Sequence, residues 1–314
     1  MPPPLFTLTL NPAIDRTVTV PGFKLGKVNR VETSRDRAGG KGINVAAALA
    51  AHGYPVAALG FLGGDNDADF ATLFALRGIT DRCLRLPGAT RVGIKIFDSL
   101  SGETTDLNFP GLTLGSGEVE VLRGQLAELA RGGGWCVLAG SLPPGVDPKL
   151  YAELITTLKA HGVRTVLDTS GAALPAALRA GPDIIKPNQH ELEALVGRAL
   201  PTEAAVIAAA RGLVAGGVGL VVVSRGAEGA CFVTDEAVLV ARPPAVTVGS
   251  TVGAGDAMVA GLVIAQIRGA SIADTARFAT ACALAALTAA AGATDGELRE
   301  RIAALEPRVE LVEA

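Results

Sequence analysis

The feature that most constrains the fold is an alternation between short apolar segments and longer amphipathic ones, from about Val45 onward. The short segments are rich in β-branched residues and read VAALGFL, WCVLAG, RTVLDTS, DIIKPN and GLVVVS. The longer segments have helical periodicity, and two clear examples are residues 147–162 and 202–217. Apolar strands separated by helices predict a mainly parallel sheet that helices cover on both faces.

Two segments depart from this alternation. Residues 15–37 and 90–109 alternate apolar and polar side chains, which is the period of half-exposed antiparallel strands. We therefore expect a small sheet that leaves the main domain and returns, as a lid or a dimer surface. An edge decoration without a function is the alternative. Residues 1–314 would then form one domain with these lid strands.

Composition and charge argue against several classes of protein. A formal net charge of −3 gives no overall field that would gather nucleic acid or an anionic membrane, so a bound anion needs a local cluster. The N-terminal residues lack the basic and apolar regions of a signal peptide. The Ala-rich residues 278–293 are too short to span a bilayer and predict a buried helix.

The cysteines and histidines carry no metal pattern. The 4 cysteines are isolated from one another, which favours reduced thiols in a cytoplasmic protein. The 3 scattered histidines argue against a zinc site and against a histidine-based triad.

The stretch STVGAGDAMVAG, residues 250–261, is a candidate site for an anion. Gly253, Ala254 and Gly255 can bring backbone N–H groups close to a phosphate, and the helix that follows adds its positive N-terminus. Asp256 beside them could accept the proton of an attacking hydroxyl, as an acidic base does in kinases. The alternative is a plain turn in which Asp256 caps the helix.

A second glycine-rich stretch, AGGKGINVA, also enters a helix. Gly39 and Gly40 let the backbone approach a ligand, Lys41 offers a point charge, and Asn44 offers a donor and an acceptor. A loop with a solvated lysine is the alternative. Two such stretches and a small separate sheet favour a two-substrate enzyme over a single binding pocket.

Two more polar stretches follow apolar strands. In KPNQHE, Asn188 and Glu191 share one face of a helical first turn, where they could organise hydrated Mg²⁺ or simply begin a helix. In SRGAEG, Ser224, Gly226 and Gly229 could approach a nucleotide or form a hairpin turn. No GxxxxGK[ST] or GxGxxG pattern occurs, so neither common nucleotide-binding loop is present.

In this order along the chain, these motifs resemble those of the ribokinase-like (PfkB) family of carbohydrate kinases. GGKGINVA resembles its N-terminal signature, STVGAGDAMVAG its C-terminal signature, and KPNQHE its NxxE motif. The resemblance covers essentially the whole chain. It implies a three-layer α/β/α sandwich with a mainly parallel central sheet and a small β-sheet lid.

Further segments, including TLTLNPAIDRTV, TRVGIKI, TDLNFPG and GSLPPGV, resemble the branch of this family that phosphorylates sugar phosphates. That similarity implies ATP-dependent, Mg²⁺-assisted phosphorylation of a ketohexose phosphate, with D-fructose 1-phosphate first among the acceptors. Tagatose 6-phosphate and fructose 6-phosphate are the alternative acceptors, and a non-catalytic sugar-phosphate sensor is an alternative of another class. By analogy, the lid strands would join two copies as a homodimer.

The resemblance also assigns roles to residues. It implies that Asp256 is the catalytic base and that the anion hole consists of Gly253, Ala254 and Gly255. It places the sugar phosphate near Asp15, Gly39, Gly40, Lys41, Asn44, Arg91, Lys27 and Lys95. It places the nucleotide near Lys186, Asn188, Ser224, Gly226, Gly229 and Thr251, with Glu191 holding Mg²⁺ through water. Arg225 departs from the family pattern, which usually has an apolar residue there.

Overall fold

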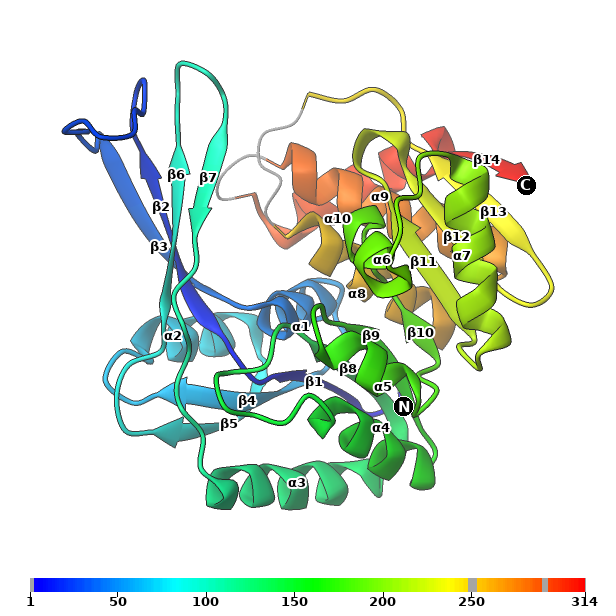
Figure 1. Cartoon of the computed structure of the whole chain (residues 1–314), viewed down its shortest axis with the longest axis horizontal. Coiled ribbons are helices and arrows are strands. Elements are labelled where there is room, and N and C mark those ends of the chain that lie inside the picture. The colour runs from blue at the N-terminus through cyan, green and yellow to red at the C-terminus, as the bar shows by residue number, and fades with distance from the viewer. Residues whose placement is uncertain (1–2, 248–252, 290–292, 314) are drawn as a thin grey trace.

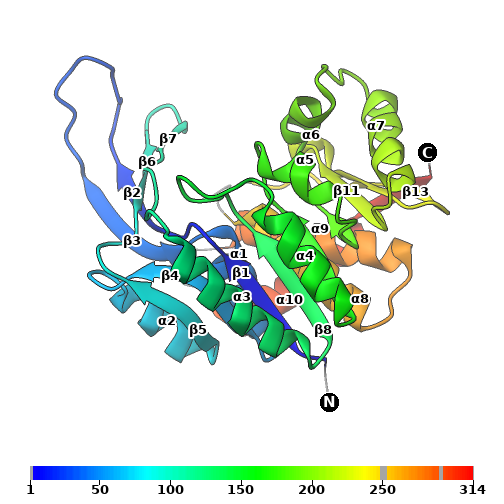
Figure 2. The same ribbon diagram turned by 60° about the horizontal axis from the view of Figure 1, so that its bottom comes forward.

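The fold is built on a ten-stranded sheet with helices on both faces (Figures 1 and 2). The computed structural model describes residues 3–247, 253–289 and 293–313. From edge to edge the strands are β14 (Glu310–Glu313), β13 (Val238–Arg242), β12 (Ala230–Val233), β11 (Leu220–Ser224), β10 (Ile184–Ile185), β9 (Val163–Asp168), β8 (Gly134–Ala139), β1 (Leu5–Thr9), β4 (Ala57–Gly63) and β5 (Thr80–Leu86).

The strands from β11 to β5 pair in parallel, whereas β11 to β14 pair antiparallel. The five apolar segments singled out in the sequence all contribute strands to this sheet. The prediction of a mainly parallel central sheet is therefore confirmed, with an antiparallel extension at one edge.

The helices divide between the two faces, and each group packs on its own half of the core. One face carries α1 (Lys41–Ala51), α2 (Ala68–Arg77), α8 (Ala254–Ile267), α9 (Ile272–Thr288) and α10 (Asp295–Leu305). The other carries α3 (Ser116–Ala130), α4 (Leu150–Ala160), α5 (Ala173–Leu178), α6 (Gln189–Val196) and α7 (Glu203–Ala215). The expected helices in residues 147–162, 202–217 and 278–293 are α4, α7 and the end of α9. No helix in the described ranges is long and apolar enough to cross a membrane.

Helix α8 is apolar nearly all round because it packs on the sheet and against α9. A Cβ atom on Gly261 would lie 2.8 Å from the Cα atom of Ala279, so the close approach of α9 depends on this glycine. The packing fixes the N-terminus of α8, which carries Asp256, against the rest of the sheet.

A second, four-stranded sheet stands beside the main one (Figure 1). Its order is β3 (Thr33–Gly39), β2 (Ala13–Thr19), β6 (Val92–Phe97) and β7 (Thr104–Leu107), which confirms strands in both alternating segments. The expectation that they are all antiparallel is wrong at the centre, where β2 and β6 run parallel. β2 follows β1 and β6 follows β5, so both strands leave the parallel main sheet in the same direction. Alternation in a sequence indicates which side chains are exposed and gives no information on strand direction.

Candidate functional site

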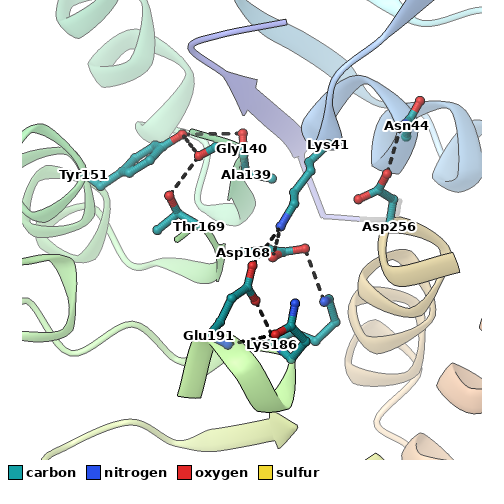
Figure 3. A network of polar contacts seen from close by, with 11 residues as sticks. Lys41, Asn44, Ala139, Gly140, Tyr151, Asp168, Thr169, Lys186, Glu191 and Asp256 are labelled. Atoms are coloured by element: carbon teal, nitrogen blue, oxygen red, sulfur yellow. Dashed lines mark hydrogen bonds and ion pairs between the residues drawn. The ribbon is translucent and has the colours of Figure 1, made fainter. Parts of the chain in front are cut away.

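Several of the predicted stretches meet at the carboxyl ends of the parallel strands, where α/β sheets collect ligands. Helix α1 begins at Lys41, α6 at Gln189 and α8 at Ala254, and β9 ends at Asp168. Their polar side chains form the network drawn in Figure 3.

Asp256 occupies the first turn of α8 and is only 7% exposed. Its Oδ2 atom accepts a hydrogen bond of 2.8 Å from Nδ2 of Asn44 on α1 (Figure 3). The N-cap residue of this helix is Gly253, which has a φ of 82°, and no side chain caps the helix. Asp256 is therefore not the cap of α8, because its carboxylate bonds to another helix instead.

The surroundings of Asp256 change its acidity. Burial, with the negative charge of Asp168, raises the pKa of the Asp256 carboxyl to about 6, against the opposing effects of Asn44, Lys41 and Lys186. A carboxylate with this pKa is ionised at neutral pH yet is basic enough to take a proton from a hydroxyl during a reaction.

Asp168, which was not among the residues selected from the sequence, lies at the centre of the network. Its carboxylate is 2% exposed and lies between two ammonium groups, 2.7 Å from Lys41 Nζ and 3.4 Å from Lys186 Nζ. Burial acts to raise the pKa of Asp168, but the two lysines outweigh it and hold that pKa below its ordinary value. An aspartate directly after the apolar run RTVL was the signal in the sequence.

Hydrogen bonds to Gly140 fix the backbone around Asp168 (Figure 3). The carbonyl of Gly140 accepts hydrogen bonds from the Tyr151 hydroxyl at 3.0 Å and the Thr169 hydroxyl at 2.9 Å. The Gly140 N–H donates to the Asp168 carbonyl at 2.9 Å. These bonds join the ends of β8 and β9 and hold Asp168 in place.

The ammonium group of Lys186 lies close to the N-terminus of α8. It is 4% exposed, and a Cβ atom on Gly255 would lie 3.3 Å from its Nζ atom. The ammonium therefore lies beside the positive end of α8, so the two can attract the same anion.

Asn188 and Glu191 form a capping box at the start of α6. Oδ1 of Asn188 accepts from the Glu191 N–H, and Oε2 of Glu191 accepts from the Asn188 N–H, both at 2.8 Å. The simple helix-start interpretation thus explains most of the motif. The remaining oxygen of Glu191, Oε1, lies 3.8 Å from Lys41 Nζ and faces the network.

A second group of charges surrounds Asp15 on β2. Burial raises the pKa of Asp15, while Lys95, Arg37 and Arg91 act to lower it. A Cβ atom on Gly39 would lie 2.5 Å from Oδ2 of Asp15, so a larger residue there would displace this carboxylate. At Gly40, φ is 111° and an added Cβ would lie 3.0 Å from Cα of Pro12, which requires glycine.

The four expected basic residues for a sugar phosphate do not form one group. Arg91 donates to the carbonyls of Asn11, Pro12 and Phe109, each at 3.2 Å, and so joins two loops beside Asp15. Lys95 lies 3.4 Å from Asp106 near the same aspartate. Lys41 instead contacts Asp168, and Lys27 is exposed in the loop between β2 and β3. That loop lies at the far end of the small sheet (Figure 1).

On the expected nucleotide side, β11 turns into β12 through the short 3₁₀ turn η1 (Gly226–Glu228). Gly229 has a φ of 93°, and a Cβ atom there would lie 1.9 Å from the Ala241 carbonyl oxygen, so the turn needs glycine. This confirms the hairpin, and Ser224 at its start forms a bridge with Asn188. Thr251 lies outside the described residues.

The sequence of this chain is similar to those of known carbohydrate kinases. The model of the pfkB family of carbohydrate kinases matches residues 8–297. The 1-phosphofructokinase of Rhodobacter capsulatus is 53% identical over 90% of this chain and 89% of its own length. That of Escherichia coli K12 is 42% identical over 97% of each chain.

Solved structures share the fold. Phosphofructokinase-2 from Escherichia coli, solved in complex with substrates and products, superposes with a TM-score of 0.89, at 34% identity over 96% of this chain and 99% of its own. Arabidopsis thaliana ribokinase has a TM-score of 0.77 over 98% of this chain and 99% of its own, at 23% identity, which speaks for the fold alone. The chain is a ribokinase-like α/β protein and belongs to the pfkB family of carbohydrate kinases.

Proposed function

We propose that this kinase transfers the γ-phosphoryl group of ATP to D-fructose 1-phosphate and forms fructose 1,6-bisphosphate. The observation that carries the proposal is the placement of Asp256, a buried carboxylate at the N-terminus of α8 with Lys186 beside that terminus. The choice of acceptor is supported by the 1-phosphofructokinases of Rhodobacter capsulatus and Escherichia coli, which are 53% and 42% identical to this chain.

In the proposed reaction, Asp256 accepts the proton of the free primary hydroxyl of the sugar as that oxygen attacks the γ-phosphorus. The bond between the γ-phosphorus and the bridging oxygen breaks, and ADP leaves with the bond's electron pair. Backbone N–H groups at Gly253, Ala254 and Gly255, with the α8 dipole, stabilise the negative charge on the transferring group. Lys186 and Lys41 add positive charge at the same place.

The residues present fit a hydrated Mg²⁺ ion better than a protein-coordinated one. No cluster of three ligating side chains occurs among the described residues, and Asp168 is already neutralised by two lysines. Mg²⁺ commonly keeps several waters and binds one or two carboxylates together with substrate phosphates. Glu191 Oε1 is the oxygen that would hold it through water. When bound, the ion offsets the charge of the ATP phosphates.

For the sugar phosphate we propose the region around Asp15, with Gly39 and Gly40. Asn44, which bonds to Asp256, would connect this region to the proposed base. Asp15 would accept hydrogen bonds from sugar hydroxyls, and Arg91 and Lys95 would supply charge for the phosphate. We propose the turn with Ser224, Gly226 and Gly229, together with Asn188 and Thr251, for the nucleotide.

The small sheet is proposed as a lid and as the contact of a homodimer within a single kinase domain. Its loops and strands expose large apolar side chains, among them Leu25 (89%), Val28 (90%), Leu100 (78%) and Phe109 (49%). Such a cluster on a lid is typical of a surface that another protein covers. Cytoplasmic location is proposed from the free cysteines.

The test is an ADP-release assay with fructose 1-phosphate, fructose 6-phosphate and tagatose 6-phosphate at equal concentrations. We expect the highest kcat/KM with fructose 1-phosphate, and a preference for either 6-phosphate would overturn the choice of acceptor. Asp256→Asn should bind both substrates but lower kcat by about 10²–10⁴-fold. Near-normal turnover in that variant would reject Asp256 as the base, and binding without any turnover in the unmodified protein would point to a sensor.

A further inference from the structure

Arg225 follows β11 directly and begins the turn proposed for the nucleotide, yet its side chain points into the protein. The side chain is only 7% exposed. NH1 donates to Oε2 of Glu203 at 2.5 Å, and NH2 pairs with Glu228 in the turn. Nε donates to Oε1 of Gln189 at 3.4 Å. All three nitrogens of the guanidinium group therefore have partners inside the protein.

These partners belong to three different elements. Glu228 lies in the turn η1, Gln189 is the first residue of α6, and Glu203 is the first residue of α7. A planar guanidinium with several fixed donors can hold such groups in one geometry, which a single ammonium cannot do. Arg225 therefore links the turn to the N-termini of two helices.

The charges in this group balance locally. Glu203 also accepts from NH2 of Arg242 on β13 at 2.9 Å, so that two arginines face two glutamates. A balanced group around a buried guanidinium offers little net charge to a phosphate. The arrangement favours a role in holding the turn over a direct contact with a nucleotide.

The contacts of Arg225 also connect to Asn188 and Glu191, the residues expected near the ATP phosphates and Mg²⁺. Gln189 follows Asn188, which forms the capping box with Glu191, and Asn188 bridges Ser224, the residue before Arg225. Ser224 N–H also donates to the Pro187 carbonyl at 3.1 Å. A shift of the turn would therefore move the start of α6 and the Glu191 oxygen that faces Lys41.

We propose that Arg225 is a positioning residue for the nucleotide, which acts through Glu203, Glu228 and Gln189 to hold the turn and the start of α6. The proposal rests on the kinase function proposed above. It predicts that loss of Arg225 weakens ATP binding selectively and leaves the sugar-phosphate side, on the other sheet, unchanged.

The experiment compares Arg225→Leu, Arg225→Lys and Glu203→Gln with Arg242→Leu as the matched control. Arg242 also pairs with Glu203, but among the described residues it makes no hydrogen bond or ion pair with the turn or with α6. We expect Arg225→Leu to raise the KM for ATP about 3- to 10-fold, with the KM for fructose 1-phosphate within about twofold. Arg225→Lys should be intermediate, and Arg242→Leu should stay within about twofold of the unmodified protein.

Glu203→Gln separates positioning from direct contact. If Arg225 acts through its partners, Glu203→Gln should also raise the KM for ATP, and its effect should not add to that of Arg225→Leu in the double variant. The proposal is overturned by an unchanged KM for ATP in Arg225→Leu, by equal increases for both substrates, or by a Glu203→Gln variant that behaves like the unmodified protein.

A second readout keeps this test independent of turnover. The rise in melting temperature on adding ATP reports binding directly, and it should be smaller in Arg225→Leu than in Arg242→Leu. If the unmodified protein shows this rise but no turnover with any acceptor, the proposed function fails while the role of Arg225 is still decided. An equal rise in all variants overturns that role.

Discussion

Lys41 Nζ lies 2.7 Å from Oδ1 of Asp168, and this contact joins the start of α1 to the end of β9. The same carboxylate lies 3.4 Å from Lys186 Nζ and contributes to the raised pKa of Asp256. Asp168 thus balances two ammonium groups and at the same time makes the neighbouring carboxylate more basic. Three elements that are far apart in the sequence become one electrostatic unit.

The first prediction concerns the acid limb of the pH profile. If Asp256 is the base, as proposed, turnover requires its ionised form. The value of kcat/KM should then fall as the pH drops through about 6, the value to which burial and Asp168 raise the pKa of Asp256. Asp168→Asn removes one cause of that rise and should move the acid limb to lower pH. Measured pH profiles of kcat/KM for both proteins check this.

The control for this prediction is Asp183→Asn. Asp183 accepts from the Thr165 N–H at 2.8 Å and lies before β10, at the other end of the strands. Substrate ionisation affects all three proteins alike and cancels in the comparison. A limb that moves equally in both variants, or that stays in place in Asp168→Asn, would contradict the electrostatic link.

The second prediction separates two lysines that the sequence placed together. Lys41 contacts the network of Asp168 and Asp256, whereas Lys95 is one of the charges around Asp15. Lys41→Met should therefore lower kcat by about tenfold or more and change the KM for the sugar phosphate little. Lys95→Met should mainly raise that KM. Steady-state kinetics of the two variants check the split, and the reverse pattern would reassign both lysines.

The third prediction concerns the exposed apolar side chains of the small sheet. Leu25 and Val28 are 89% and 90% exposed in the loop between β2 and β3. If the sheet forms the homodimer contact, Leu25→Asp combined with Val28→Asp should shift the mass measured by light scattering from dimer to monomer. Leu76→Asp on α2, whose leucine is 80% exposed, is the control and should leave the mass unchanged. A monomeric unmodified protein would refute the proposed contact.

Much of this site could be predicted from the sequence because glycine-rich stretches and polar residues after apolar strands mark strand ends. Asp256 and Asn44 were selected in this way, whereas Lys186 was named only through the family resemblance. Asp168 escaped because one aspartate after a strand is common, and only the fold shows that two lysines converge on it. Local spacing could not show either that Asn188 and Glu191 bond to each other or that Lys41 turns toward Asp168.

The parallel pairing of β2 with β6 is a feature of the fold that the sequence also could not predict. Alternation predicted the two lid segments, since it depends only on which side chains are exposed. The parallel direction depends instead on where each strand leaves the main sheet. The connection between β2 and β6 includes β3, α1, β4, α2 and β5, so no turn motif records the direction.

The fourth prediction concerns two helical glycines with opposite surroundings. Gly261 on α8 faces α9, where an added Cβ would lie 2.8 Å from Cα of Ala279, whereas an added Cβ on Gly212 in α7 would meet nothing within 4 Å. Gly261→Ala should therefore lower the free energy of unfolding by about 1–3 kcal/mol, because two packed helices must separate. Gly212→Ala should raise it by about 0.5–1 kcal/mol, because alanine favours the helix. Denaturant unfolding of both variants checks the opposite signs, and a loss of stability in both would show that packing at Gly261 is not the cause.

The last prediction concerns the stability of Asp256→Asn. The pKa of Asp256 is raised from 3.8 to about 6 in the folded protein, so the folded state binds this proton more tightly than the unfolded state does. The ionised carboxylate therefore opposes folding above about pH 6, and this unfavourable contribution disappears as the pH falls toward 4. The asparagine of the variant cannot ionise, and its side-chain oxygen can still accept from Asn44.

At pH 8, Asp256→Asn should therefore be more stable than the unmodified protein by about 1–3 kcal/mol, even though we expect its kcat to be far lower. The difference should shrink as the pH is lowered to 5, because the aspartate of the unmodified protein then takes up its proton. Thermal melts at several pH values measure it. Asp36→Asn is the control, because the hydrogen bond from Arg16 lowers the pKa of Asp36 and its replacement should give no such gain. If Asp256→Asn were equally or less stable at pH 8, the ionised Asp256 carboxylate would not lower the stability of the folded protein, and this prediction would be wrong.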